Sequence, residues 1–122
     1  MVKNESLNIS ELQKKIQQFA TERDWQQFHT PKNIAMALTV EAAELLELFQ
    51  WLTPEESLTM QDDAKWKERV GEEMSDVLLY LFRMADHLNV NLPEAIANKM
   101  EKNAKKYPAD LVRGKSKKYS EY

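Results

Sequence analysis

The chain has 122 residues, a length that suggests a single domain. Its 20 acidic side chains outnumber its 17 basic ones, so the net charge of −3 gives no bulk reason to expect a nucleic-acid partner. The absence of cysteine excludes a disulfide scaffold and a zinc–thiolate site, and two glycines leave no loop of the kind that cradles phosphates.

The composition predicts an all-α protein. Its start, MVKNESLNISEL, lacks the basic and apolar regions of a signal peptide, and no apolar run approaches the ~18 residues of a membrane span. We therefore expect a cytoplasmic protein with no membrane segment and no nucleic-acid partner.

Capping residues divide the chain into four main helices and one short one. Asn8, with Glu11 three residues later, forms a capping box that predicts a first helix through about Arg23. The other expected elements are a loop at 24–30, a second helix at 31–52, a short helical turn at 53–56, a third helix at 63–88, a fourth at 91–107, and a basic, irregular tail at 113–122. Together they predict one four-helix-bundle-like domain over residues 1–122.

A glutamate interrupts the apolar stripe of the second helix. Alternating steps of four and three residues stay on one face of an α-helix. On the face that contains Glu41 the other members are Ile34, Leu38, Leu45, Leu48 and Leu52. The third helix repeats the pattern, with Glu73 in a row made of Trp66, Val70, Val77, Tyr80 and Met84. A carboxylate that loses its water without gaining a partner is costly or stays protonated, so each row needs a reason for its acid.

Each glutamate has a second acid three residues further on, Glu44 in one helix and Asp76 in the other. Antiparallel packing through these stripes would bring the four carboxylates together, and they cannot all ionise unless cations lie among them. Mg²⁺, with Mn²⁺ as a substitute, suits such oxygen ligands. The alternative is that the acids face water, as most single pairs at this spacing do. A di-iron site is excluded because His29 and His87 do not supply its Glu-x-x-His ligands.

The pattern Glu41-x-x-Glu44, then 28 residues, then Glu73-x-x-Asp76 resembles the ExxE…ExxD signature of MazG-like nucleoside triphosphate pyrophosphohydrolases. Further segments are similar to their all-α dCTP pyrophosphatase branch: ERDWQQFHTPKN (22–33), ELLELFQW (44–51), EEMSDVLLYL (72–81) and NKMEKNAKKYPADL (98–111). The resemblance implies Mg²⁺-dependent hydrolysis of a nucleoside triphosphate to the monophosphate and pyrophosphate, in nucleotide-pool house-cleaning. It also implies a homotetramer, built as a dimer of dimers, in which the four acids are the catalytic and metal-binding residues.

The resemblance also implies which residues bind the nucleotide. Trp25, Trp51 and Tyr80 match positions around the base and sugar, where aromatic rings can stack; a core or interface role is the alternative for Trp51. The remaining candidates lie on the loop, at the start of the second helix and at the end of the fourth: His29, Lys32, Asn33, Asn103, Lys106 and Tyr107. Ile16 stands where the dCTP enzymes carry a histidine that helps frame the base. The expected substrates are dCTP and modified pyrimidine deoxynucleotides.

Two other functions fit the same helices, namely a non-catalytic oligomerisation module and a nucleotide-binding regulatory module without turnover. The third helix has a second apolar face that predicts burial between subunits under any of the three: Met74, Leu78, Phe82 and Ala85. The acids on the core stripes favour the enzyme, because an assembly module has no use for them.

Overall fold

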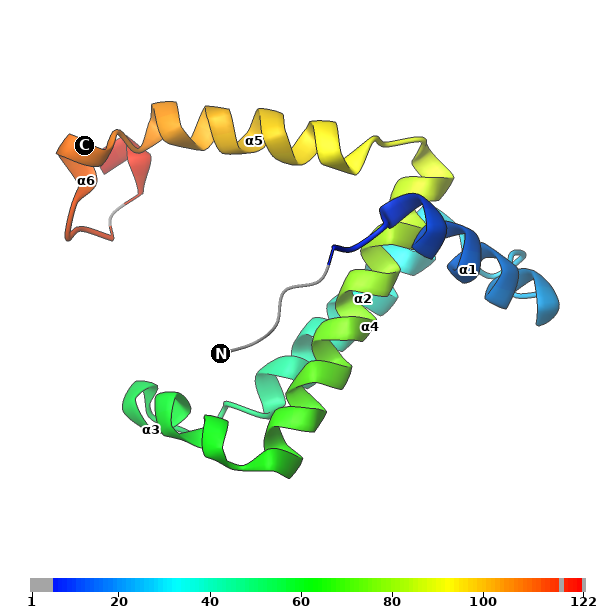
Figure 1. Cartoon of the computed structure of the whole chain (residues 1–122), viewed down its shortest axis with the longest axis horizontal. Helices are drawn as coiled ribbons and strands as arrows, with labels where there is room; N and C mark the ends of the chain where they lie inside the picture. The colour runs from blue at the N-terminus through cyan, green and yellow to red at the C-terminus, as the bar shows by residue number, and fades with distance from the viewer. Residues whose placement is uncertain (1–5, 117, 122) are drawn as a thin grey trace. The chain divides into compact units, whose positions relative to one another are not determined.

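The computed structural model describes residues 6–116 and 118–121 (Figure 1). Over this part of the chain every regular element is a helix, as the composition predicts. In chain order the elements are α1 (Ile9–Glu22), α2 (Pro31–Glu47), α3 (Pro54–Thr59), the 3₁₀ turn η1 (Met60–Asp62), α4 (Ala64–Leu88), α5 (Leu92–Lys106), α6 (Ala109–Val112) and a second 3₁₀ turn, η2 (Tyr119–Glu121).

The chain divides into two compact units, Met1–Asn89 and Val90–Tyr122. The first unit contains α1 to α4, and the second contains α5, α6 and η2. The single four-helix domain stays a prediction. No helix among the described residues is long and apolar enough to cross a membrane.

The predicted helix starts are confirmed by side-chain caps. In each case a side-chain oxygen accepts a hydrogen bond from the backbone N–H three residues further on, which satisfies one of the free donors at a helix start. The five capping residues are Asn8, Thr30, Thr53, Asp63 and Asn91. The sequence therefore specifies where each of the five helices α1 to α5 begins.

The end of α2 was predicted wrongly: the helix stops at Glu47 and not near Leu52. The indole N–H of Trp66, at the start of α4, donates to the backbone carbonyl of Leu48 at 3.0 Å. That carbonyl would accept from the backbone N–H of Leu52 in a continued helix, but this N–H donates to Phe49 instead. The Phe49 and Trp66 rings also meet edge to face, with centroids 5.0 Å apart. A tertiary contact therefore ends the helix.

Two further stretches are more helical than expected. The short turn predicted at 53–56 extends through α3 and continues as η1. Inside the tail at 113–122, η2 forms where irregular chain was expected, and the backbone N–H of Lys118 donates to the Glu121 carboxylate at 2.7 Å. The tail residues 117 and 122 lie outside the described residues.

The first unit is organised by the contact between α2 and α4, which is the most extensive between its helices. The two helices lie side by side and run in opposite directions, and α1 packs against α4 (Figure 1). The most buried apolar side chains come from all three helices: Ala20, Ile34, Phe82 and Ala85. Phe82 and Ala85 are thus buried within one chain, which corrects their expected place between subunits. Met74 and Leu78, on the same predicted face, are 56 % and 43 % exposed.

Candidate metal and nucleotide site

The antiparallel pairing of α2 and α4 brings together acids that are far apart in the sequence. Carboxylate oxygens of Glu41, Glu73 and Asp76 all lie within 4.8 Å of one another, a spacing at which they could hold one metal ion. All three side chains are half-buried. Glu44 lies close enough for its charge to act on Glu41 and Glu73, although it is not within that three-residue group.

The crowding of these acids changes how they bind protons. Burial, and after it the neighbouring carboxyl groups of Glu73, Glu44 and Asp76, raise the pKa of Glu41 to about 7. The pKa of Glu73 is also raised, chiefly by burial and by the charges of Glu44 and Asp76, although the neighbouring carboxyl group of Glu41 acts in the opposite direction. At neutral pH without a cation, Glu41 and Glu73 are therefore partly protonated as a pair, whereas isolated glutamates would be fully ionised.

The donor set fits a hard divalent cation. The Oε2 atoms of Glu41 and Glu73 are buried, and neither has a hydrogen-bond partner among the described residues. A buried carboxylate oxygen without a partner is costly, and a cation would supply the missing interaction. The cluster contains only oxygen ligands, which Mg²⁺ and Mn²⁺ prefer over nitrogen or sulfur.

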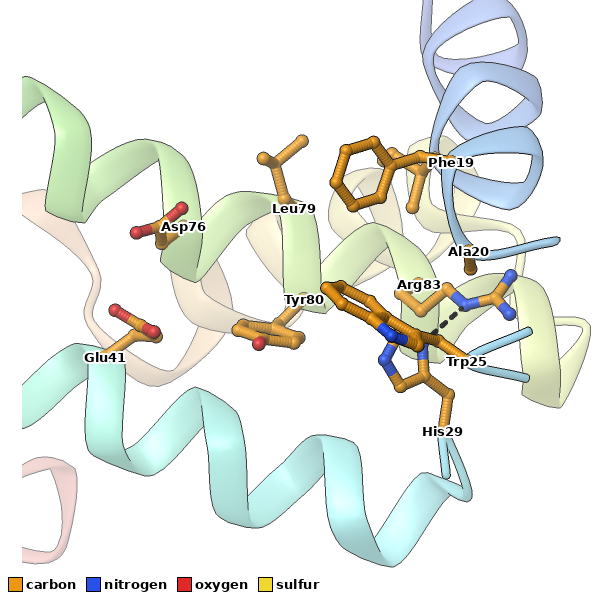
Figure 2. Close-up of a pocket in the computed structure, with 10 residues that line it drawn as sticks. Phe19, Ala20, Trp25, His29, Glu41, Asp76, Leu79, Tyr80 and Arg83 are labelled. Atoms are coloured by element: carbon orange, nitrogen blue, oxygen red, sulfur yellow. Dashed lines mark hydrogen bonds between the residues drawn. The ribbon is translucent and has the colours of Figure 1, made fainter. Parts of the chain in front are cut away.

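A cavity of about 340 Å³ opens beside the acids. Figure 2 shows Glu41 and Asp76 at one end, Trp25 and His29 at the other, and Tyr80 between them. The rest of the wall is formed by Ile16, Phe19, Ala20, Leu79 and Arg83. The cavity thus joins an acidic end to an aromatic end, and it contains five of the residues predicted to form the site.

The loop between α1 and α2 holds the aromatic end in place. The backbone N–H of Trp25 donates to the carbonyl of Ala20 at 2.9 Å, and the side-chain amide of Asn33 donates to the carbonyl of Phe28 at 3.0 Å. The ring of Trp25 lies between those of Phe19 and His29, with centroid distances of 5.7 and 6.0 Å. These contacts turn Trp25 and His29 toward the cavity.

Tyr80 provides a hydrogen-bond donor in the middle of the cavity. Burial raises the pKa of its hydroxyl, and the charges of Glu41, Asp76 and Glu44 raise it further. The hydroxyl therefore keeps its proton at neutral pH and can donate to a ligand.

The structure does not bring every predicted residue to this cavity. Asn33 and Lys32 lie outside the cavity wall at the start of α2, where the Asn33 amide donates to the loop backbone and Lys32 is exposed. Trp51 follows α2 and is 87 % exposed. The last three candidates, Asn103, Lys106 and Tyr107, belong to the second unit, where Asn103 and Lys106 lie on α5 and Tyr107 directly follows it.

Sequence reasoning missed several wall residues. Phe19, Ala20 and Leu79 are ordinary apolar side chains at helical spacing, and nothing in the sequence separates them from core residues. Arg83 is more informative, because a buried arginine is rare and needs a partner. Its position in the apolar part of α4, seven residues after Asp76, was the available signal.

Comparisons with known proteins agree with this geometry. A model of the MazG-like family matches residues 36–122, which include all four acids. The chain is 46 % identical over 104 residues to dCTP pyrophosphatase 1 of Homo sapiens and 44 % identical to that of Mus musculus. Each match covers 85 % of this chain but only 61 % of the relative, so the chain spans less than two thirds of those proteins.

A solved structure resembles this chain over nearly its whole length. It is a pyrophosphatase from Archaeoglobus fulgidus DSM 4304, which superposes with a TM-score of 0.77 at 38 % identity and covers 88 % of this chain and 99 % of its own. The helical fold and the paired acids are those of a MazG-like protein. The chain belongs to the MazG-like family.

Proposed function

We propose that the protein is a divalent-metal-dependent nucleoside triphosphate pyrophosphohydrolase that releases a nucleoside monophosphate and pyrophosphate. The observation that carries the proposal is the joining of two chemistries in one cavity. The carboxylates of Glu41 and Asp76 lie at one end, where Glu41 has a buried oxygen without a partner, and packed aromatic rings lie at the other. The names of the relatives, dCTP pyrophosphatase 1, favour a pyrimidine deoxynucleotide as the substrate.

The chain's own residues suggest how this reaction would proceed. Glu41, Glu73 and Asp76, with Glu44 beside them, would hold the cation, which supplies positive charge to neutralise phosphate oxygens. A carboxylate of the cluster would take the proton of the attacking water. Trp25 would stack on the base, and the Tyr80 hydroxyl would donate to the sugar or the first phosphate. The α-phosphate directly follows the sugar, so it is the first phosphate to reach the acids.

The product analysis tests this proposal. Incubation of dCTP and its 5-substituted forms with the protein and Mg²⁺ should yield deoxynucleoside monophosphate and pyrophosphate in equal amounts, measured by anion-exchange chromatography and a pyrophosphate assay. A diphosphate together with orthophosphate would reject the position of cleavage. Binding without any product would favour the nucleotide-binding regulatory module instead.

Trp25→Ala should raise KM about tenfold and leave kcat nearly unchanged. Stacking on a base contributes about 1–3 kcal/mol, and it acts equally in the ground state and the transition state. Steady-state kinetics with dCTP measure both constants, and Trp25→Phe, which keeps a stacking ring, is the matched control. A fall in kcat with unchanged KM would place Trp25 outside the base site.

The protein is also proposed to form a homotetramer. Exposed apolar side chains support assembly, among them Leu46, Trp51, Met74 and Leu78. We expect Leu78→Glu to give a smaller species in light scattering at micromolar concentration, because the new charge would have to be desolvated at the interface. Phe82→Glu is unsuitable for this test, since Phe82 is buried within the chain. A wild-type monomer with full activity would contradict the assembly.

The remaining proposed roles belong to residues outside the cavity wall. Lys32 would attract the triphosphate from the start of α2, and Asn103, Lys106 and Tyr107 would bind the pyrophosphate. Trp51 would contact the nucleotide only in an assembly that brings it to a cavity, because within one chain it lies outside the wall. Mg²⁺ is the proposed ion, Mn²⁺ its substitute, and the cytoplasm the proposed location.

A further inference from the structure

Arg83 is a buried cation in the wall of the cavity. Its residue is only 4 % exposed, and it lies on α4 one helical turn beyond Leu79 and Tyr80. The Nη1 atom lies 3.7 Å from a carboxylate oxygen of Asp86, one turn further along the helix. A charge this well buried must be partnered, and the Asp86 contact anchors one side of the guanidinium.

The other contact of Arg83 reaches the loop between α1 and α2. Its Nε–H donates to Nδ1 of His29 at 3.4 Å, across 54 residues of sequence (Figure 2). A guanidinium is protonated at every relevant pH, has only donors and cannot accept. Nδ1 of His29 must therefore present a lone pair to Arg83. A neutral imidazole whose Nδ1 accepts carries its proton on Nε2.

The surroundings keep the ring neutral. Burial lowers the pKa of His29, and the positive charge of Arg83 and the nearby His87 lower it further. Asp86 forms its ion pair with Arg83, and no ion pair among the described residues joins it to His29 itself. Figure 2 shows the second ring nitrogen of His29 pointing away from Arg83, toward the side of the cavity where Tyr80 and Glu41 lie.

We propose that Arg83 is a positioning residue that fixes His29 as the neutral Nε2–H form, and that this N–H donates a hydrogen bond to an acceptor atom on the edge of the bound base. This inference rests on the proposed function, because its ligand is the nucleotide substrate. It goes further by naming the hydrogen bond that recognises the base. Ring nitrogens and carbonyl oxygens accept from this N–H, whereas exocyclic amino groups do not. His29 thereby selects the edge of the base that enters the pocket.

The first test needs no substrate. A ¹⁵N–¹H correlation spectrum of the ligand-free wild-type protein at pH 7.5 should show His29 with an unprotonated Nδ1 and a protonated Nε2. Arg83→Met keeps the length and the apolar stem but removes the donor and the charge. It should give a mixture of the two neutral forms and a His29 pKa nearer its ordinary value. A protonated Nδ1 in the wild-type spectrum would overturn the proposal by itself.

The second test uses binding of a non-hydrolysable α,β-imido analogue of dCTP with Mg²⁺. The Nε2–H proton should move downfield on binding, and Arg83→Met should weaken binding about tenfold. Arg83→Lys, which retains a donor, should recover part of the loss, and Arg69→Met, the same change at an exposed position on α4, should bind as the wild type does.

A double-variant comparison separates positioning from general stability. In a His29→Phe background, Arg83→Met should cause no further loss, because the imidazole that it orients is gone. Full additivity, or an Nε2–H resonance that does not respond to the nucleotide, would refute the donor role. If Arg83→Met does not fold, the His29 spectrum of the wild type and nucleotide binding by Arg83→Lys still test the proposal. Failure of the proposed function would show as an absence of nucleotide binding, with the tautomer measured independently.

Discussion

Amide substitutions at Glu41, Glu44, Glu73 and Asp76 should each lower kcat by about 10³-fold, the scale seen when one electrostatic group is removed from a reacting centre. The oxygens of Glu41, Glu73 and Asp76 converge between α2 and α4, and the charge of Glu44 acts on two of them. A neutral amide of the same shape removes charge that would hold the cation. The KM for the nucleotide should change less than kcat, because Trp25 and His29, which would hold the base, lie at the far end of the cavity. Steady-state kinetics at several Mg²⁺ concentrations measure the effect.

Glu72→Gln is the matched control for this series. Glu72 directly precedes Glu73 in the sequence but is exposed. Its substitution should leave kcat within about twofold of the wild type, as for most surface changes away from a site. An equal loss of kcat in Glu72→Gln and Glu73→Gln would contradict a catalytic role for the cluster. Circular dichroism of each variant would separate lost chemistry from lost helix.

The metal-free protein should lose stability as the pH rises from about 4.5 through about 7. The pKa of Glu41 is raised from 4.5 to about 7 in the folded chain, so over this interval the folded state binds more protons than the unfolded state. The free energy of unfolding therefore falls with increasing pH, and the contribution is fully present only below about pH 4.5. Thermal melts in EDTA at pH 5 and pH 8 measure the slope.

Glu41→Gln should flatten that slope and raise the melting temperature at pH 8, by a shift of order 5 °C. The amide removes one of the crowded charges without changing the size of the side chain. Mg²⁺ should reverse the ranking at pH 8, since an ion that binds only the folded state stabilises the wild type. A variant that melts well below the wild type in EDTA at pH 8 would instead make Glu41 a structural residue.

The sequence was sufficient for the starts of the main helices and for the meeting of the acids Glu41, Glu73 and Asp76. Capping residues such as Thr30 and Asp63 act within three residues, so they can be read without knowledge of the fold. The shared helical phase of Glu41 and Glu73 predicted their meeting because an antiparallel pair of helices places equivalent stripes face to face. Both signals are local or strictly periodic.

The parts that failed depend on contacts between distant residues. The end of α2 is decided by Trp66, 18 residues after Leu48, and the burial of Phe82 depends on the helices that pack around α4. Arg83 meets His29 across 54 residues, and no spacing rule connects a loop histidine to a helical arginine. Propensity and periodicity contain no information on such pairs.

The hydrogen bond from Asn33 to Phe28 has a consequence for the energetics of recognition. Together with the bond from Trp25 to Ala20, it closes the short loop on itself at both ends. The side chains proposed to face the base, those of Trp25 and His29, are thus held in position before a ligand arrives. The conformational entropy of ordering this loop is lost when the chain folds and not when the nucleotide binds. More of the contact free energy is therefore left for discrimination among bases.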